Sequence, residues 1–231
     1  MFVLGIDTSN TTLSVALMEN GVVLDEITEA TKNDHSKRLM PAIERLFTTH
    51  NRQPSELDLI VVAKGPGSYT GVRIGVTVAK TMAWTLNKPL VGVSSLEVHA
   101  RNLSVDGLVI PIFDARRETV FAGVYEGKSH DIMIEDGHYE LRQLLAKLNE
   151  ENQIMHFLGN DAKRYESLIV EMLGEKAVFV EEEVLNIPHA ATLIEIGLTR
   201  EPIKDVHHFV PSYLRIPEAE MNWLESQKSH D

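Results

Sequence analysis

The feature that most constrains the fold of this chain is a β-hairpin pattern that occurs twice. Residues 3–24, VLGIDTSNTTLSVALMENGVVL, alternate strongly after Thr12, with Leu13, Val15 and Leu17 on one face, and contain the hairpin turn signal Asn20-Gly21. A similar pattern returns in residues 110–127, IPIFDARRETVFAGVYEG. An offset of 107 aligns Asp7 with Asp114 and then pairs Leu13 with Val120, Val15 with Ala122, Leu17 with Val124, and Glu19 with Glu126. The pattern favours a duplicated domain over two unrelated hairpins that happen to look alike.

Helical periodicity follows each hairpin. It predicts one helix in residues 36–51 of the first half, and helices in residues 139–150, 161–173 and 189–199 of the second, with short strands between them. The fold class predicted is therefore α/β with two related lobes. We expect lobes at residues 1–103 and 104–217, and a polar tail at residues 218–231.

Composition limits the compartment and the partners. The chain has no cysteine, which excludes disulfides, thiolate zinc sites and cysteine nucleophiles. It has no signal peptide pattern and no apolar run long enough for a membrane span, so we expect a cytoplasmic protein with no membrane partner. The net charge of −12 repels polyphosphate, so a nucleic acid would be held mainly by a partner protein.

A glycine-rich stretch, AKGPGSYTGVRIG at residues 63–75, joins an apolar strand pattern to a helical one. Such a connection can present backbone N–H groups to phosphate. It lacks the Lys of a P-loop, and Pro66 excludes a nucleophile elbow around Ser68. The candidate nucleotide loop consists of Asp7, Thr8, Gly65, Gly67 and Gly71. The alternative is a tight connection without a ligand, with Asp7 accepting backbone N–H bonds in a turn.

The turn after Asp114, in the second hairpin, is a poorer candidate for phosphate binding than the glycine-rich stretch. Asp114 is followed by Arg116, Arg117 and Glu118, and bulky residues prevent the close backbone approach that glycine allows. The ten histidines form neither H-E-x-x-H nor H-x-x-x-H, so the sequence predicts no metal site.

The helix predicted at residues 72–87 is apolar most of the way round. Gly75, Ala79 and Ala83 recur every four residues and form a smooth stripe that another helix can approach closely. The stripe faces either a partner or the core of this chain. The candidate partner interface consists of Leu39, Ile43, Arg73, Gly75, Val76, Ala79, Met82 and Ala83.

Six segments, in order and over nearly the whole chain, carry a specific resemblance. They are LGIDTSNTTLSVAL (4–17), HSKRLMPAIE (35–44), GPGSYTGVRIGVTVAKTMA (65–83), GVSSLEVHA (92–100), FDARRETVFAGVY (113–125) and PSYLRIPEAE (211–220). Together they resemble the bacterial TsaB (YeaZ) family. The resemblance implies the duplicated actin-like, Hsp70-like ATPase fold (ASKHA). It also implies a role in making threonylcarbamoyladenosine in tRNA, together with a catalytic TsaD-type paralogue and a TsaE-type ATPase.

The resemblance further implies a subunit that is not itself the catalyst. The paralogue carries a metal-binding H-x-x-x-H where this chain has Ser95 and His99, so one ligand is missing. We therefore expect no catalytic residue and no required cofactor in this chain, with ATP and metal used by its partners and tRNA bound only indirectly. The alternatives are a small-molecule kinase or glycoprotease-like enzyme of the same superfold, and a homodimer that pairs through the same helices.

Overall fold

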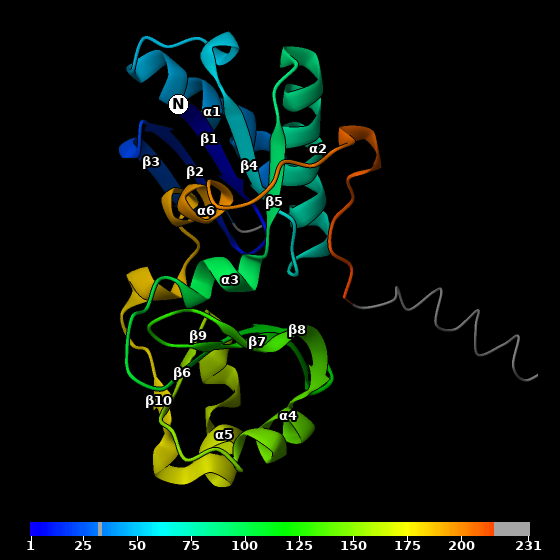
Figure 1. The fold of residues 1–231 in the computed structure, drawn as a ribbon. Coiled ribbons are helices and arrows are strands. Elements are labelled where there is room, and N and C mark those ends of the chain that lie inside the picture. The colour runs from blue at the N-terminus through cyan, green and yellow to red at the C-terminus, as the bar shows by residue number, and fades with distance from the viewer. Residues whose placement is uncertain (32–33, 215–231) are drawn as a thin grey trace, which may run out of the picture.

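Two five-stranded sheets with the same strand order form the molecule (Figure 1). The computed structural model describes residues 1–31 and 34–214. In the first sheet the order is β3 (Val22–Ala30), β2 (Thr12–Glu19), β1 (Phe2–Asp7), β4 (Leu59–Ala63) and β5 (Leu90–Val93). In the second it is β8 (Ile132–Glu140), β7 (Thr119–Glu126), β6 (Leu108–Asp114), β9 (Met155–Leu158) and β10 (Ala177–Phe179). The first three strands of each order pair antiparallel and the others pair parallel.

This shared topology confirms the α/β duplication, and the aligned apolar residues of β2 and β7 lie in the corresponding cores of the two lobes. The alignment of the two aspartates is wrong by one residue. Ile6 pairs with Val15, whereas Ile112 pairs with Ala122, so Phe113 rather than Asp114 corresponds to Asp7. The connection between these paired residues is one residue longer in the second hairpin, and the apolar alternation of the strands carries no information on the length of the turn between them.

Helices cover both faces of each sheet because the central strands bury side chains on both sides. In the first lobe α1 (His35–Thr49) and α2 (Tyr69–Leu86) pack on one face and α6 (Ala190–Gly197) on the other. In the second lobe α4 (Leu141–Leu148) and α5 (Glu166–Leu173) pack on one face. The short α3 (Ser95–Ala100) packs on its other face, toward the first lobe (Figure 1). The 3₁₀ helices are Pro54–Glu56, Ala162–Tyr165, Gly174–Lys176, Glu183–Asn186 and Val206–His208.

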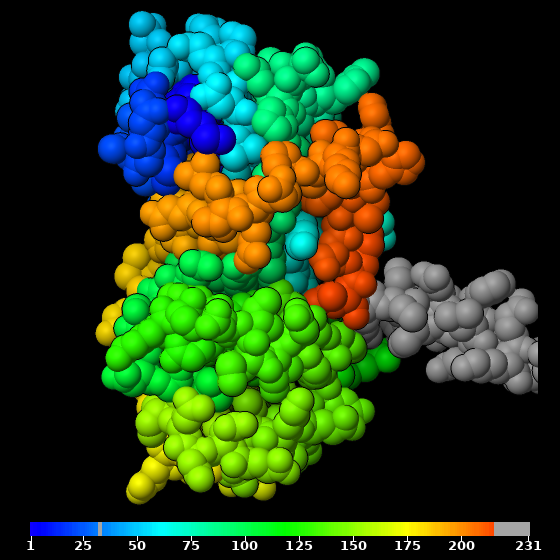
Figure 2. All heavy atoms as spheres, in the orientation of Figure 1, coloured from blue at the N-terminus to red at the C-terminus, as the bar shows by residue number. Residues whose placement is uncertain are grey.

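The chain returns to the first lobe after its second sheet, which corrects the predicted boundary of 104–217. Helix α6 contributes Leu193 and Ile194 to the core of the first lobe. Residues 203–214, which we call the C-terminal strap, then run beside β5 and α2 (orange to red in Figure 2). The Ile203 N–H donates to Leu90 O at 2.8 Å and the Ser212 N–H to Lys64 O at 2.7 Å. The predicted tail at 218–231 lies outside the described residues.

Within the described ranges, none of the helices is both long enough and apolar enough to cross a membrane.

Candidate functional site

A cleft of about 870 Å³ lies between the lobes. The first lobe contributes the turn after β1 and the glycine-rich loop, the second contributes the turn after β6, and the strap closes one side. The lining residues are Ser9, Asn10, Pro66, Gly67, Ser68, Tyr69, Thr70, Val72, Phe113, Asp114, Ala115, Arg116, Arg117, Phe121, Asp161, Pro211, Ser212, Tyr213 and Leu214. Of the predicted nucleotide loop, only Gly67 is in this set.

The glycine-rich loop is filled by this chain's own turn. A Cβ at Gly67 would overlap the carbonyl oxygen of Ser9, and one at Gly71 would overlap that of Thr8. The Ser68 N–H donates to Ser9 O at 2.7 Å, and the Thr8 hydroxyl donates to Gly71 O at 2.7 Å. These glycines therefore allow two backbone segments to pack together, which is the ligand-free alternative.

Asp7 is fully buried and organises the same turn. Its Oδ1 accepts from Ser9 N–H at 2.8 Å and from the Ser9 hydroxyl at 2.7 Å. Burial raises the pKa of Asp7, and the two bonds from Ser9 oppose that shift. Its Oδ2 has no hydrogen-bond partner among the described residues, and the side chain does not line the cleft. Of its two predicted roles, the structure places Asp7 in the turn role.

The second turn places three successive non-glycine residues in the left-handed region, at φ 68° for Arg116, 52° for Arg117 and 57° for Glu118. Such backbone costs free energy and persists because bonds on both sides fix it. Thr119 N–H donates to Arg116 O at 2.9 Å, and Leu141 N–H donates to Glu118 O at 3.1 Å.

The carboxylate of Asp114, at the start of this turn, is already paired with side chains of this chain. It forms an ion pair with Arg164 and accepts from the Tyr165 hydroxyl at 2.6 Å. Burial acts to raise the pKa of Asp114, but the bond from Tyr165 and the neighbouring arginines outweigh it, and the pKa is lowered. The cleft therefore presents arginines and a paired carboxylate where a phosphate loop would present glycine.

His99 is buried behind the cleft and is not part of its lining. Its Nδ1 lies 3.0 Å from Ser95 O, and its ring meets Phe113 edge-on at 4.8 Å between centroids. Burial lowers the pKa of His99 to about 4, so the ring is neutral. In the described part of the chain, no group of three His, Cys, Asp or Glu side chains is placed to hold a metal ion.

Most of the predicted partner interface lies inside the molecule. Leu39, Ile43, Gly75, Val76, Ala79 and Ala83 are buried in the core of the first lobe. The smooth stripe exists because α2 approaches its own sheet closely: a Cβ at Gly75 would overlap the Thr8 hydroxyl. Arg73 is exposed and Met82 is half-buried, so only these two of the eight residues remain accessible.

An accessible apolar surface does remain between the two helices. Met40 on α1 is 49% exposed, and Ile74, Val78 and Met82 on α2 are half-buried. The opposite side of α1 binds β3 through Arg38 and Arg45, which meet Glu29. By helical periodicity Met40 lies on the side of α1 away from β3. Lys80 of α2 donates to carbonyl oxygens of the strap, so Ile74, Val78 and Met82 lie on the side of α2 away from the strap. We call these four residues the α1–α2 face.

Sequence reasoning missed a cluster at the mouth of the cleft. The Arg73 guanidinium lies 3.8 Å from the centre of the Tyr69 ring, and its Nε donates to the Tyr213 hydroxyl at 2.7 Å. Arg73 and Tyr213 are 140 residues apart, a separation that no local pattern can bridge. Near the C-terminal end of α2, Trp84 is exposed and packs edge-on against His207 of the strap.

Comparisons with known proteins agree with one another. The sequence matches the family described as "TsaD: tRNA N6-adenosine threonylcarbamoyltransferase" over residues 22–223. It is 45% identical to the Bacillus subtilis tRNA threonylcarbamoyladenosine biosynthesis protein TsaB over 99% of this chain and 100% of that one. A Solidesulfovibrio magneticus tRNA N6-adenosine threonylcarbamoyltransferase is 34% identical over 43% of this chain and 31% of its own.

The fold comparison points the same way. A crystal structure from Pseudomonas aeruginosa, described as an uncharacterized protein with similarity to peptidase YEAZ, superposes with a TM-score of 0.78 and 25% identity. The match covers 93% of this chain and 99% of that one.

Proposed function

Because this chain belongs to the TsaB family of tRNA threonylcarbamoyladenosine biosynthesis proteins, we propose that it is a partner subunit of the modification complex and not its catalyst. One observation carries the second half of this proposal. The glycines that suggest a phosphate-binding loop accommodate the chain's own turn at Thr8 and Ser9. The space that a bound phosphate would need is filled by backbone.

The partner that best fits is a TsaD-type transferase, which binds the α1–α2 face. Exposed methionine and half-buried aliphatic side chains suit docking by another protein, because Met adapts its shape to the surface it meets. The Solidesulfovibrio magneticus transferase is similar in sequence to part of this chain. This similarity supports a TsaD-type paralogue as the partner, with equivalent lobes of the two proteins in contact. A homodimer through the same face would compete with this complex.

The remaining components follow from charge and chemistry. A net charge of −12 disfavours direct binding of tRNA, so the transferase holds the tRNA and this chain contacts it only indirectly. This chain requires no cofactor, and the TsaE-type ATPase and the transferase use ATP and metal. In this arrangement the synthesis of threonylcarbamoyladenosine, for which its relatives are named, takes place without a catalytic step in this subunit.

The role of the α1–α2 face in binding can be tested with two glutamate substitutions, one on this face and one on the other lobe. Met40→Glu places a carboxylate on the α1–α2 face, where binding would have to desolvate it. Val170→Glu is the matched control, because Val170 is 46% exposed on α5 of the other lobe. With both variants folded, we expect Met40→Glu to weaken binding of the TsaD-type protein at least tenfold, about 1.4 kcal/mol, and Val170→Glu to leave it unchanged. Equal affinities for both variants would remove the face from the proposal.

Catalysis is tested separately. We expect the isolated chain to show no turnover of ATP with Mg²⁺, and tRNA modification to require the transferase. A metal-dependent rate that disappears in Asp7→Asn would show instead that this chain is an enzyme.

A further inference from the structure

The C-terminal strap lies along one side of α2 and runs antiparallel to it (Figure 1). Near the end of the helix, the Trp84 ring packs edge-on against His207. About one turn earlier, Lys80 donates through Nζ to two carbonyl oxygens of the strap, at 2.9 and 2.6 Å. Near the start of the helix, Arg73 donates to the Tyr213 hydroxyl. We call the following residues the α2–strap face: Tyr69, Arg73, Lys80, Trp84, Val210 and Tyr213.

The strap is held firmly against the first lobe. The Phe209 ring packs so closely on β5 that a Cβ at Gly92 would overlap it. Backbone bonds hold the strap on both sides of Phe209, at Ile203 and at Ser212. The next residue after Phe209 is Val210, which is 63% exposed. The outward side chains of the strap therefore form a fixed surface, and binding to such a surface orders few additional groups.

The α2–strap face has the composition of a protein interface. Trp84 is 66% exposed, and Tyr69 and Tyr213 are also exposed. Trp, Tyr and Arg are the residue types that contribute most to binding energy at protein interfaces. The face lies on the side of α2 opposite the α1–α2 face, so a partner on one face leaves the other accessible.

Arg73 is oriented to bind a carboxylate. Its guanidinium stacks on the Tyr69 ring at 3.8 Å from the ring centre, and its Nε donates to the Tyr213 hydroxyl at 2.7 Å. Within the described ranges it forms no ion pair with a carboxylate. Its two terminal nitrogens can therefore donate in parallel to both oxygens of one carboxylate, the geometry that a guanidinium favours.

The charge around Arg73 also favours an acidic ligand. The chain has 34 Asp and Glu in 231 residues, but residues 69–88 contain none and the strap contains only Asp205. Asp205 is already paired, because it accepts from His207 N–H at 2.8 Å and lies 2.7 Å from His208 Nδ1. The α2–strap face is therefore a basic, aromatic region on an acidic protein.

The dimensions of the face suit a short peptide better than a nucleic acid. Trp84 lies about three turns beyond Arg73, or about 16 Å along the axis of α2, and an extended chain spans this distance in about five residues. A nucleic acid strand would bring several phosphates over that length. The face offers them only Arg73 and Lys80, and Lys80 already uses two donors on the strap.

We propose that the α2–strap face binds an acidic segment of a partner protein. A carboxylate of the segment pairs with Arg73 between the two tyrosines, and an apolar side chain about five residues away packs on Trp84 and Val210. This interaction does not rest on the function proposed for the α1–α2 face.

The probe is the peptide EEGSGLF, acetylated and amidated at its ends, which separates carboxylates from an aromatic ring by about five residues. Titrated into the full chain, it should shift the NMR signals of the Trp84 indole N–H and the Arg73 Nε–H saturably, with a Kd below about 1 mM. The chain has two tryptophans, so Trp84→Phe assigns the indole signal. The matched peptide QQGSGLF, which has no carboxylate, should bind about tenfold more weakly.

Variants locate the carboxylate. Arg73→Gln should weaken binding of EEGSGLF about tenfold and remove its advantage over QQGSGLF. Arg142→Gln, at an exposed position of α4, is the matched control and should leave the Kd unchanged. Met40→Glu should also leave it unchanged, so the result is independent of whether the α1–α2 face binds a transferase.

Four outcomes would overturn the proposal. They are the absence of saturable shifts up to about 5 mM peptide, equal affinities of the two peptides, unchanged binding in Arg73→Gln, and loss of binding in Arg142→Gln equal to that in Arg73→Gln. The oligonucleotide hexauridylate provides a further test. If it shifted the Trp84 and Arg73 signals with higher affinity than EEGSGLF, the face would bind nucleic acid, and the proposal would be wrong.

Discussion

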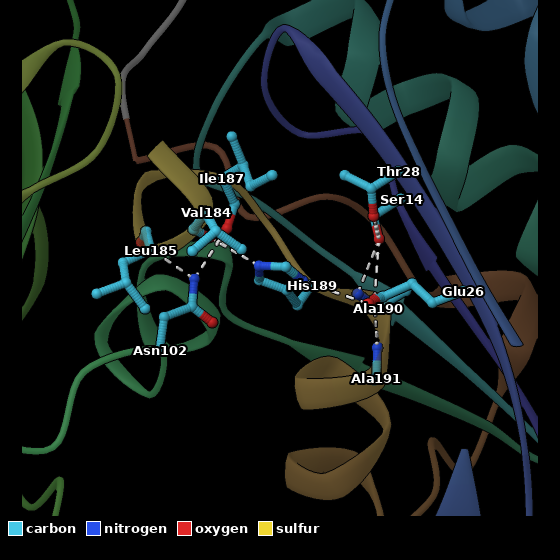
Figure 3. A network of polar contacts seen from close by, with 10 residues as sticks. All are labelled: Ser14, Glu26, Thr28, Asn102, Val184, Leu185, Ile187, His189, Ala190 and Ala191. Atoms are coloured by element: carbon cyan, nitrogen blue, oxygen red, sulfur yellow. Dashed lines mark hydrogen bonds and ion pairs between the residues drawn. The ribbon is translucent and has the colours of Figure 1, made fainter. Parts of the chain in front are cut away.

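The Glu26 carboxylate lies 3.3 Å from Nδ1 of His189, although the two residues are 163 positions apart (Figure 3). Glu26 also accepts from the N–H of Ala191 at 2.9 Å, at the start of α6. The other ring nitrogen of His189 lies 2.8 Å from Val184 O. Both ring nitrogens thus face acceptors, and only the doubly protonated ring donates to both. The ion pair holds α6 against β3 at the point where the chain crosses back to the first lobe.

This pair predicts a pH dependence of stability. The bond to Glu26 raises the pKa of His189 above 6.5, so its contribution is fully present below pH 6.5 and is lost as pH rises through the raised pKa. Burial opposes ionisation of Glu26, but His189 and the Ala191 N–H outweigh it and lower its pKa below 4.5. The contribution of Glu26 is present above pH 4.5 and is lost as pH falls through the lowered pKa.

We therefore expect His189→Gln to cost about 1–2 kcal/mol of unfolding free energy near pH 6 and clearly less near pH 9, measured by urea denaturation. His207→Gln, at an exposed position of the strap, is the control. A deficit that is the same at both pH values would mean that His189 acts by packing alone.

The glycine-rich loop predicts a contrast between glycines. Gly67→Ala and Gly71→Ala force a methyl group onto the carbonyl oxygens of Ser9 and Thr8, and overpacking of this kind costs about 1–3 kcal/mol. Gly21→Ala is the matched control, because at Gly21 a Cβ meets nothing within 4 Å and only the φ of 81° is unfavourable. Thermal melting should rank Gly21→Ala as clearly the mildest. If all three melted alike, the close approach of turn and loop would not matter.

Burial of the small-residue stripe changes what substitutions there should do. Ala79 is 0% and Ala83 1% exposed, so a leucine at either position must displace the core of the first lobe. We expect Ala79→Leu and Ala83→Leu to lower the free energy of unfolding by about 1–3 kcal/mol in the isolated protein. A variant of normal stability that failed to bind its partner would contradict the packing described for α2.

His99 should behave as a buried neutral imidazole. Burial lowers its pKa to about 4, so its ring resonances in NMR should titrate with a midpoint near pH 4 instead of the 6.5 of a free imidazole. Because the unfolded chain binds this proton near pH 6.5 and the folded chain does not, His99 also removes stability as pH falls from 6.5 toward 4. Addition of Zn²⁺ should leave the His99 resonances unchanged, and broadening of these signals by the metal would contradict the assignment.

Local sequence patterns predicted the helices and strands well. They predicted poorly which distant segments pack against one another. The alternation in β2 and β7 and the four-residue spacing in α2 are properties of a few neighbouring residues, so both the duplication and the helix were predictable. The orientation of α2 was not. Glycine and alanine suit a close approach to a partner helix or to the chain's own sheet, and only the position of Thr8 beneath Gly75 decides between them.

The cleft shows the same limit. Arg73 and Tyr213 meet because the strap returns to the first lobe, and nothing in the composition of residues 189–214 distinguishes a return from a continuation of the second lobe. The glycines of the loop were recognised as sites of close approach, but what approaches them is set by the register of a turn about sixty residues earlier.

The return of α6 to the first sheet orders the events of synthesis. Val3, Ala16 and Val61 are covered by Leu193 and Ile194, so this face of the first sheet stays uncovered while the second lobe is being translated. A ribosome must add more than a hundred residues after β5 before the first lobe can close. The second lobe, continuous from β6 to β10, can complete its sheet earlier, so the part of the chain made first is the part that finishes folding last.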